Sequence, residues 1–120
     1  RDACEGNPAI RLLENIPDVS RFYADITVFV NAVREGRGLR TKVVEAAAFG
    51  RPIVSTPLGA EGLESFRMPI FNDVESLAQG LRTLEDVGEW RKAAHHNRSI
   101  VEAGFSVRSI GTSLMDLLAP

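Results

Sequence analysis

The sequence predicts an α/β fold in which helices cover a parallel β-sheet on both faces. Short runs of branched apolar residues alternate along the chain with segments of helical periodicity. The runs are apolar throughout, which is typical of strands buried on both faces of a parallel sheet. With 120 residues, the chain has the size of one domain and can bury a hydrophobic core without metals or disulfides.

Three apolar runs are the predicted strands. They are residues 10–14 (IRLLE), 26–30 (ITVFV) and 52–55 (PIVS), each bounded by proline or polar residues, and residues 68–71 are a further candidate. This is a small sheet for such a fold. We therefore interpret residues 1–120 as part of a Rossmann-like domain whose first strands lie upstream. The edge left by those strands is expected to be exposed and to favour self-association.

Helices are predicted between and after these strands. Asp18 can cap a short first helix, and later helices are expected to start near residues 40, 73, 87 and 106. Asn72 and Glu75 have the spacing of a capping box, and Gly104 is a predicted helix stop. The third and fourth of these helices carry apolar stripes: Val74, Leu77, Ala78, Leu81 and Leu84 on one, and Val87, Trp90, Ala94 and Val101 on the other.

Composition excludes several classes of function. The net charge of -2 provides no general electrostatic footprint for nucleic acid. Cys4 is the single cysteine, and there is neither a signal peptide nor a long apolar run, so we predict a cytoplasmic protein, one that could also bind peripherally at the inner membrane face. His95 and His96 are adjacent on a helix and diverge, so they do not suggest a shared metal site, and we expect no metal or cofactor.

A glycine-rich and basic segment follows the strand at residues 26–30. Gly36 and Gly38 allow a close backbone approach in front of the helix that begins near Leu39. The amino terminus of a helix attracts phosphate, and four basic residues add positive charge there: Arg34, Arg37, Arg40 and Lys42. The segment therefore suggests a site for an anionic ligand.

Glu45 lies about one turn into this helix, behind the expected phosphate site. Its carboxylate could accept hydrogen bonds from the hydroxyls of a ribose or a sugar. A ligand with a phosphate at the helix amino terminus and hydroxyls near Glu45 would be a nucleotide or a sugar phosphate. Spacing alone leaves a structural interpretation equally open, in which Gly36 and Gly38 serve only the turn and the arginines are solvated.

The segment GRGLRTKVVEAAAFGRPIVSTPLGAEGL closely resembles the donor-binding segment of GT-B glycosyltransferases of family 4. Members often read G-x-G-x-x-x-K-x-x-E-A-x-A-x-G-x-P-V-V-x-T-x-x-G-x-E-G-L, and this chain follows the pattern without a gap from Gly36 to Leu63, with Ile53 as a conservative replacement. The flanking segments are similar too, so that the resemblance extends from about residue 7 to residue 118.

The resemblance implies an incomplete C-terminal domain that binds a nucleotide-sugar donor. Glu45 is then expected to bind the ribose hydroxyls, while the amides of the glycine loop contact the diphosphate and the sugar. Glu61 could contact the ligand or cap the turn that follows the segment TPLG. No catalytic residue is assigned. The predicted donor-binding residues are Arg34, Gly36, Arg37, Gly38, Leu39, Arg40, Lys42 and Glu45.

One position departs from the usual family pattern. The family's first glutamate, seven residues before the second, would fall at position 37, where this chain has Arg37. This puts a carboxylate contact to the donor sugar in doubt. A subgroup with the loop R-x-G-x-G-x-R-x-K is the better match, through Arg34, Gly36, Gly38, Arg40 and Lys42.

The implied function is retaining transfer of a sugar from a nucleotide diphosphate donor to a glycan or lipid acceptor, as in polysaccharide biosynthesis. The acceptor would bind a missing N-terminal domain, so that residues 1–120 alone should be inactive. Helix amides and basic side chains would stabilise the departing diphosphate without a metal. Two alternatives stay open: a non-catalytic nucleotide-sugar-binding or interaction domain, and a GT-B-fold epimerase or phosphorylase.

Overall fold

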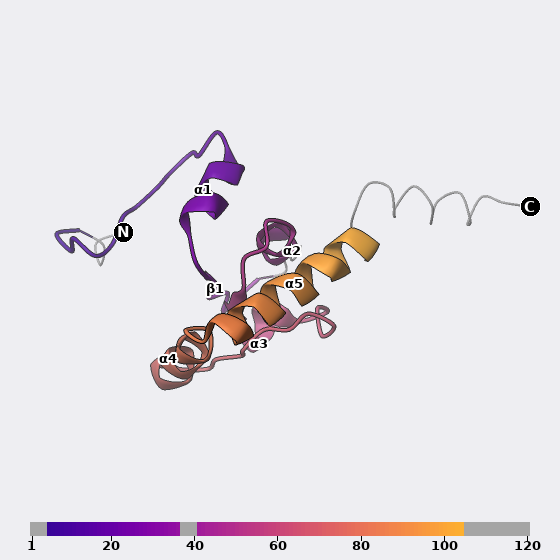
Figure 1. Ribbon diagram of the computed structural model, residues 1–120. Helices are drawn as coiled ribbons and strands as arrows, with labels where there is room; N and C mark the ends of the chain where they lie inside the picture. Colours follow the sequence, from indigo (N-terminus) through magenta and orange to yellow (C-terminus); the bar gives the residue numbers. More distant parts are fainter. Residues whose placement is uncertain (1–4, 37–40, 105–120) are drawn as a thin grey trace, which may run out of the picture.

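The computed structural model describes residues 5–36 and 41–104 of the chain. Figure 1 shows these residues as a small α/β unit, with helices packed around two short strands. The elements, in chain order, are α1 (Val19–Asp25), β1 (Phe29–Asn31), α2 (Thr41–Ala48), β2 (Ile53–Ser55), α3 (Pro57–Ala60), α4 (Val74–Thr83) and α5 (Val87–Gly104).

The two strands pair in parallel, as the sequence predicts. Phe29 lies opposite Ile53 and Asn31 lies opposite Ser55. The predicted strands 26–30 and 52–55 are thus confirmed, although the first begins later, at Phe29. The candidate at residues 68–71 adds only one parallel bridge, from Ile70 to Ser55.

The predicted strand at residues 10–14 is wrong. These residues form no regular element, and their apolar side chains are exposed, with 52% of Leu12 accessible to solvent. An apolar run becomes a strand only where a neighbouring strand satisfies its backbone hydrogen bonds, and no described segment pairs with this one. In Figure 1 the segment extends away from the sheet before it reaches α1.

Helix starts agree with the sequence except at one cap. Asp18 caps α1 by accepting a hydrogen bond from the Ser20 amide at 3.0 Å. The capping box of α4, however, uses Asp73 and Ser76 and not Asn72 and Glu75 as predicted. The short Asp73 and Ser76 side chains satisfy each other's backbone amides, at 2.8 and 3.2 Å, which fixes the start one residue later. The helix predicted from residue 106 lies outside the described residues.

Two hydrophobic clusters cover opposite faces of the sheet. One cluster contains Ile53 and the other contains Val54, the next residue of β2, because successive side chains of a strand point to opposite faces. The first cluster consists of Tyr23, Val43, Ala46, Ala47, Ile53, Leu63, Phe66 and Val101, and the second of Val54, Phe71, Leu84 and Ala93. Both faces of the sheet are therefore covered, which agrees with a Rossmann-like layer.

The apolar stripes of α4 and α5 are buried only beyond their first residues. Leu84 and Val101 belong to the core, but Val74 is 81% exposed and Val87 is 61% exposed. Each of these two valines is the first residue of its helix. There the apolar stripe extends beyond the residues that pack against the core. Helix α5 contributes Val101 to the first cluster and Ala93 to the second.

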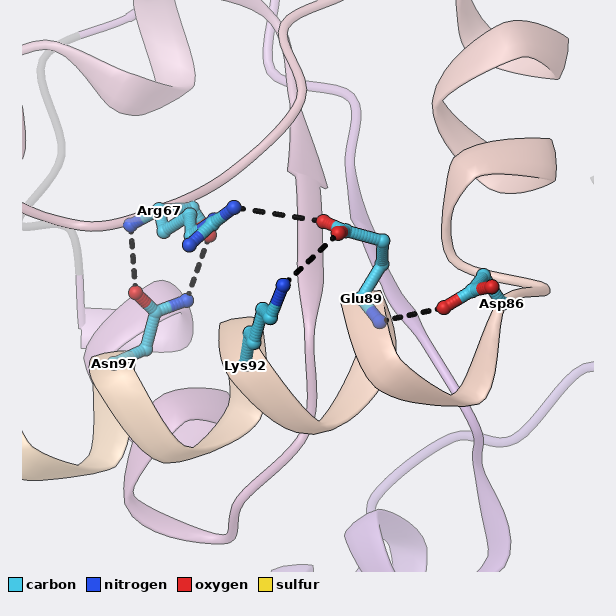
Figure 2. Close-up of polar contacts among 5 residues, drawn as sticks. All are labelled: Arg67, Asp86, Glu89, Lys92 and Asn97. Atoms are coloured by element: carbon cyan, nitrogen blue, oxygen red, sulfur yellow. Dashed lines mark hydrogen bonds and ion pairs between the residues drawn. The ribbon is translucent and has the colours of Figure 1, made fainter.

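A buried amide fixes α5 to the loop that precedes Ile70. The Asn97 side chain is 0% exposed and makes two hydrogen bonds with the backbone of Arg67, as Figure 2 shows. Its Oδ1 accepts from the Arg67 amide at 2.6 Å, and its Nδ2 donates to the Arg67 carbonyl at 2.9 Å. Exposed ion pairs of Glu89 with Arg67 and Lys92, each at 3.5 Å, lie nearby but contribute little.

We expect Asn97→Ala to destabilise the fold by about 1 to 3 kcal/mol, because it removes two part-buried hydrogen bonds that hold the backbone of Arg67. Urea denaturation followed by circular dichroism measures the change. Gln79→Ala, which removes an exposed amide from α4, is the matched control and should change stability by less than about 0.5 kcal/mol. Equal effects of the two substitutions would contradict the role assigned to Asn97.

Candidate functional site

The carboxyl ends of β1 and β2 form a buried polar edge. The strands end at Asn31 and Ser55, which are 8% and 0% exposed. The Asn31 amide donates to Ser55 Oγ and to the Gly59 carbonyl, both at 3.3 Å. In open parallel sheets, ligands bind in the crevice outside this edge. The network therefore fixes the loops that would form such a crevice.

The segment after β2 closes tightly onto this edge. Thr56 caps α3, because its hydroxyl accepts from the Gly59 amide at 3.1 Å, and it donates to the Val33 carbonyl. A Cβ atom on Gly59 would lie 2.5 Å from Asn31 Nδ2 and 2.6 Å from Ser55 Oγ. Sequence analysis did not identify this network, although threonine followed by proline is a typical helix start.

Glu61 lies at the end of α3 with an exposed side chain. It borders a hollow of about 420 Å³ that is also lined by Leu63, Phe66 and Ile70. Glu61 is the C-cap residue of α3, where its backbone amide donates to the Leu58 carbonyl, and the neighbouring Gly62 amide donates to the Glu64 carboxylate at 3.0 Å. A ligand contact of Glu61 stays a prediction.

The basic loop is described only in part. Arg37, Gly38, Leu39 and Arg40 lie outside the described residues, while Arg34 and Lys42 are exposed and, within the described residues, form no ion pair with Glu45. Gly36 has a φ of 101°, a backbone conformation that residues other than glycine rarely adopt. This backbone conformation explains the glycine at position 36 and leaves both interpretations of the segment open.

Helix α2 starts at Thr41, directly after this loop, and Glu45 is its fifth residue. Helix α2 lies in the crossover between the parallel strands β1 and β2, so its amino terminus is directed to the carboxyl edge of β1. Glu45 is partly buried, and its Oε1 atom is buried without a hydrogen-bond partner among the described residues. Native proteins rarely leave a buried carboxylate oxygen unsatisfied, because the lost hydration is costly.

Tyr23 of α1 packs against α2, the helix that carries Glu45. Its side chain is 1% exposed, and burial is the main reason that its pKa is raised to about 12. The negative charge of Glu45 and a hydrogen bond with its carboxylate also raise this pKa. The sequence analysis gave Tyr23 no part in the site.

Other site types find no support in the described part of the chain. Within residues 5–36 and 41–104, no group of three histidine, cysteine or acidic side chains could hold a metal ion. The helices of the same residues are too short or too polar to cross a membrane.

Comparison with known proteins gives the family. The family model described as glycosyl transferases group 1 matches residues 1–86, a range that includes every predicted donor-binding residue. The chain belongs to this family. Searches of curated proteins and of solved structures gave no match. Membership of glycosyl transferases group 1 supports glycosyl transfer, which in general uses a nucleotide-sugar donor and an acceptor.

Tyr23 provides a direct test of this site, because it is the chain's single tyrosine. We expect its tyrosinate absorbance to titrate at about pH 12. Glu45→Gln should lower this pKa by removing the negative charge, but it should stay above 10 because burial is the larger cause. Glu75→Gln, an exposed change on α4, should leave it unaltered, and an unshifted pKa in Glu45→Gln would contradict the proximity of the two groups.

The same shift predicts a loss of stability at high pH. The unfolded chain releases the Tyr23 proton near pH 10, while the folded chain keeps it up to about pH 12. Stability should therefore fall by about 1.4 kcal/mol for each pH unit across this window. Tyr23→Phe should remove this component from the pH dependence of urea denaturation. A slope that is identical in wild type and variant would show that Tyr23 does not cause it.

Proposed function

We propose that the chain binds the nucleotide-sugar donor of a retaining GT-B glycosyltransferase of family 4, which transfers a sugar to a glycan or lipid acceptor. The proposal is supported by the glycine-rich basic motif, by membership of glycosyl transferases group 1, and by the position of the motif after β1 of a parallel sheet. In this proposal the chain is a donor-binding domain, and the acceptor is held elsewhere in the protein.

The observation that carries the proposal is the carboxylate of Glu45. It lies about 6 Å from the start of α2 along the helix axis, behind the loop and helix amino terminus that would hold a diphosphate. Its buried oxygen Oε1 has no partner in the described residues and would accept a hydrogen bond from a ligand hydroxyl. A nucleoside diphosphate provides both groups, the hydroxyls on its ribose and the negative charge on its diphosphate.

The basic residues would stabilise the charge that develops on the leaving nucleoside diphosphate. Arg34 and Lys42 flank the helix start and are exposed, so they are free to approach a phosphate from solvent. Arg37, at the position where related enzymes have a glutamate, would act on the diphosphate and not on the sugar. Preorganised amides and cations of this kind lower the barrier for departure of an anionic group.

We expect Glu45→Gln to weaken nucleoside diphosphate binding roughly tenfold to a hundredfold, because charge-assisted hydrogen bonds contribute about 1.5 to 3 kcal/mol. Calorimetry with uridine, guanosine and adenosine diphosphates measures the effect. Glu75→Gln is the matched control, and it should bind as wild type does. Unchanged affinity in Glu45→Gln, with folding confirmed by circular dichroism, would favour the structural interpretation of the motif.

Arg37→Ala should separate the phosphate contact from the ribose contact. Because its proposed interaction is electrostatic, the substitution should weaken binding of the nucleoside diphosphate more than binding of the uncharged nucleoside. Glu45→Gln should weaken both. If Arg37→Ala reduced the two affinities by the same factor, Arg37 would have no specific role at the diphosphate.

A further inference from the structure

We propose that Thr56 is a positioning residue for the basic loop, residues 34–40, because its hydroxyl holds the chain at Val33, directly before this loop. The inference rests on the proposed function, since it takes the loop as the place where the diphosphate of the donor binds. It adds to the site a side chain that follows β2 and is not among the predicted donor-binding residues.

The Thr56 hydroxyl joins two segments that are distant in the sequence. Its Oγ1 atom donates to the Val33 carbonyl at 2.5 Å and accepts from the Gly59 amide at 3.1 Å. A hydroxyl has one hydrogen to donate and lone pairs to accept, so both bonds can form together. Thr56 is 7% exposed, so water competes little for either bond. The segment after β1 is in this way attached to the start of α3.

Two further hydrogen bonds align the segment after β1 with α3. The Thr56 amide donates to the Asn31 carbonyl at 3.1 Å, and the Asn31 side-chain amide donates to the Gly59 carbonyl at 3.3 Å. The bond to Val33 lies farther along the chain than these two. Among the described residues, no hydrogen bond joins residues 34–36 to the rest of the fold. The Thr56 hydroxyl therefore makes the attachment that is nearest to the basic loop.

The packing at this edge leaves little room for Thr56 to shift. The preceding Ser55 is 0% exposed, and its hydroxyl donates to the Thr56 carbonyl at 3.0 Å and accepts from the Asn31 amide at 3.3 Å. Gly59 approaches so closely that a Cβ atom there would lie 2.5 Å from Asn31 Nδ2. The buried side chains of Asn31, Ser55 and Thr56 are all hydrogen-bonded, so a small movement cannot replace a partner that is lost.

A chain that is held at Val33 enters the glycine-rich segment from a fixed position. Three residues span at most about 10 Å, so Gly36 lies within that distance of the bond. The first part of the basic loop is therefore kept near the carboxyl edge of the sheet, where ligands bind in folds of this kind. Holding the loop there before the ligand arrives reduces the conformational entropy that is lost on binding.

Removing the hydroxyl should therefore weaken binding through the diphosphate. Thr56→Val keeps the shape of the side chain but cannot form the bond to Val33. We expect it to weaken binding of uridine, guanosine or adenosine diphosphate about threefold to tenfold, and to change binding of the uncharged nucleosides less. Thr56→Ser keeps the hydroxyl and should bind as wild type does. Thr83→Val, which removes an exposed hydroxyl from α4, is the matched control and should also bind normally.

The attachment can also be tested without a ligand. Trypsin cleaves after arginine, and Arg34 directly follows Val33 and is exposed. Thr56→Val should accelerate cleavage after Arg34 about threefold to tenfold, because the segment opens locally more often. Cleavage after Arg82, in the last turn of α4, should keep its wild-type rate, and Thr56→Ser should restore the rate at Arg34. Mass spectrometry of the fragments measures both rates. Equal acceleration at the two arginines, or an unchanged rate at Arg34, would overturn the inference.

Calorimetry in the full chain distinguishes failure of the inference from failure of the proposed function. If wild type binds the diphosphates and Thr56→Val binds them equally well, or loses diphosphate and nucleoside affinity by the same factor, Thr56 does not position the loop and the donor-binding function stands. If wild type binds none of the diphosphates, the proposed function fails, and the ligand role of Thr56 fails with it. Cleavage after Arg34 then still decides whether Thr56 holds the loop.

Discussion

The parallel pairing of β1 and β2 is the constraint on which the rest of the described structure depends. It places the carboxyl ends of both strands at one edge, where Asn31 and Ser55 meet through a hydrogen bond of 3.3 Å. It also directs Ile53 and Val54 of β2 to opposite hydrophobic clusters. Because parallel strands need a crossover between them, α2 must begin at this same edge. The amino terminus of α2 is thereby directed to the edge at which ligands bind in such sheets.

Local patterns predicted those parts of the fold that are determined by nearby residues. The runs at 26–30 and 52–55 became β1 and β2, and the proposed starts near 40, 73 and 87 lie within one residue of α2, α4 and α5. The run at 10–14 has the same apolar character, yet it is no strand here, because strand formation depends on a partner elsewhere in the chain. Sequence periodicity does not contain that information.

The residues of the candidate site fall into the same two groups, those that local sequence patterns predict and those that depend on contacts between distant segments. Glu45 and the glycine loop could be identified from their spacing, since a helix start and the residue one turn into it are local features. Tyr23 could not, because it precedes Glu45 by a helix end, a strand and a loop and approaches it only after the sheet has formed. Asn97 shows the same limit. Its position on α5 gave no sign that it would bind the backbone of Arg67, 30 residues away. Buried polar contacts between distant segments are set by packing and not by periodicity.

Helix α5 has a consequence for how this unit unfolds. Its 18 residues span about 27 Å, and it alone among the described helices supplies buried residues to both clusters, Val101 to one and Ala93 to the other. Detaching it would expose apolar surface on both faces of the sheet at once. The two faces therefore do not open independently, and α5 makes them a single cooperative unit. Amides of β2, which pairs with β1, would then exchange with solvent only when both clusters are lost together.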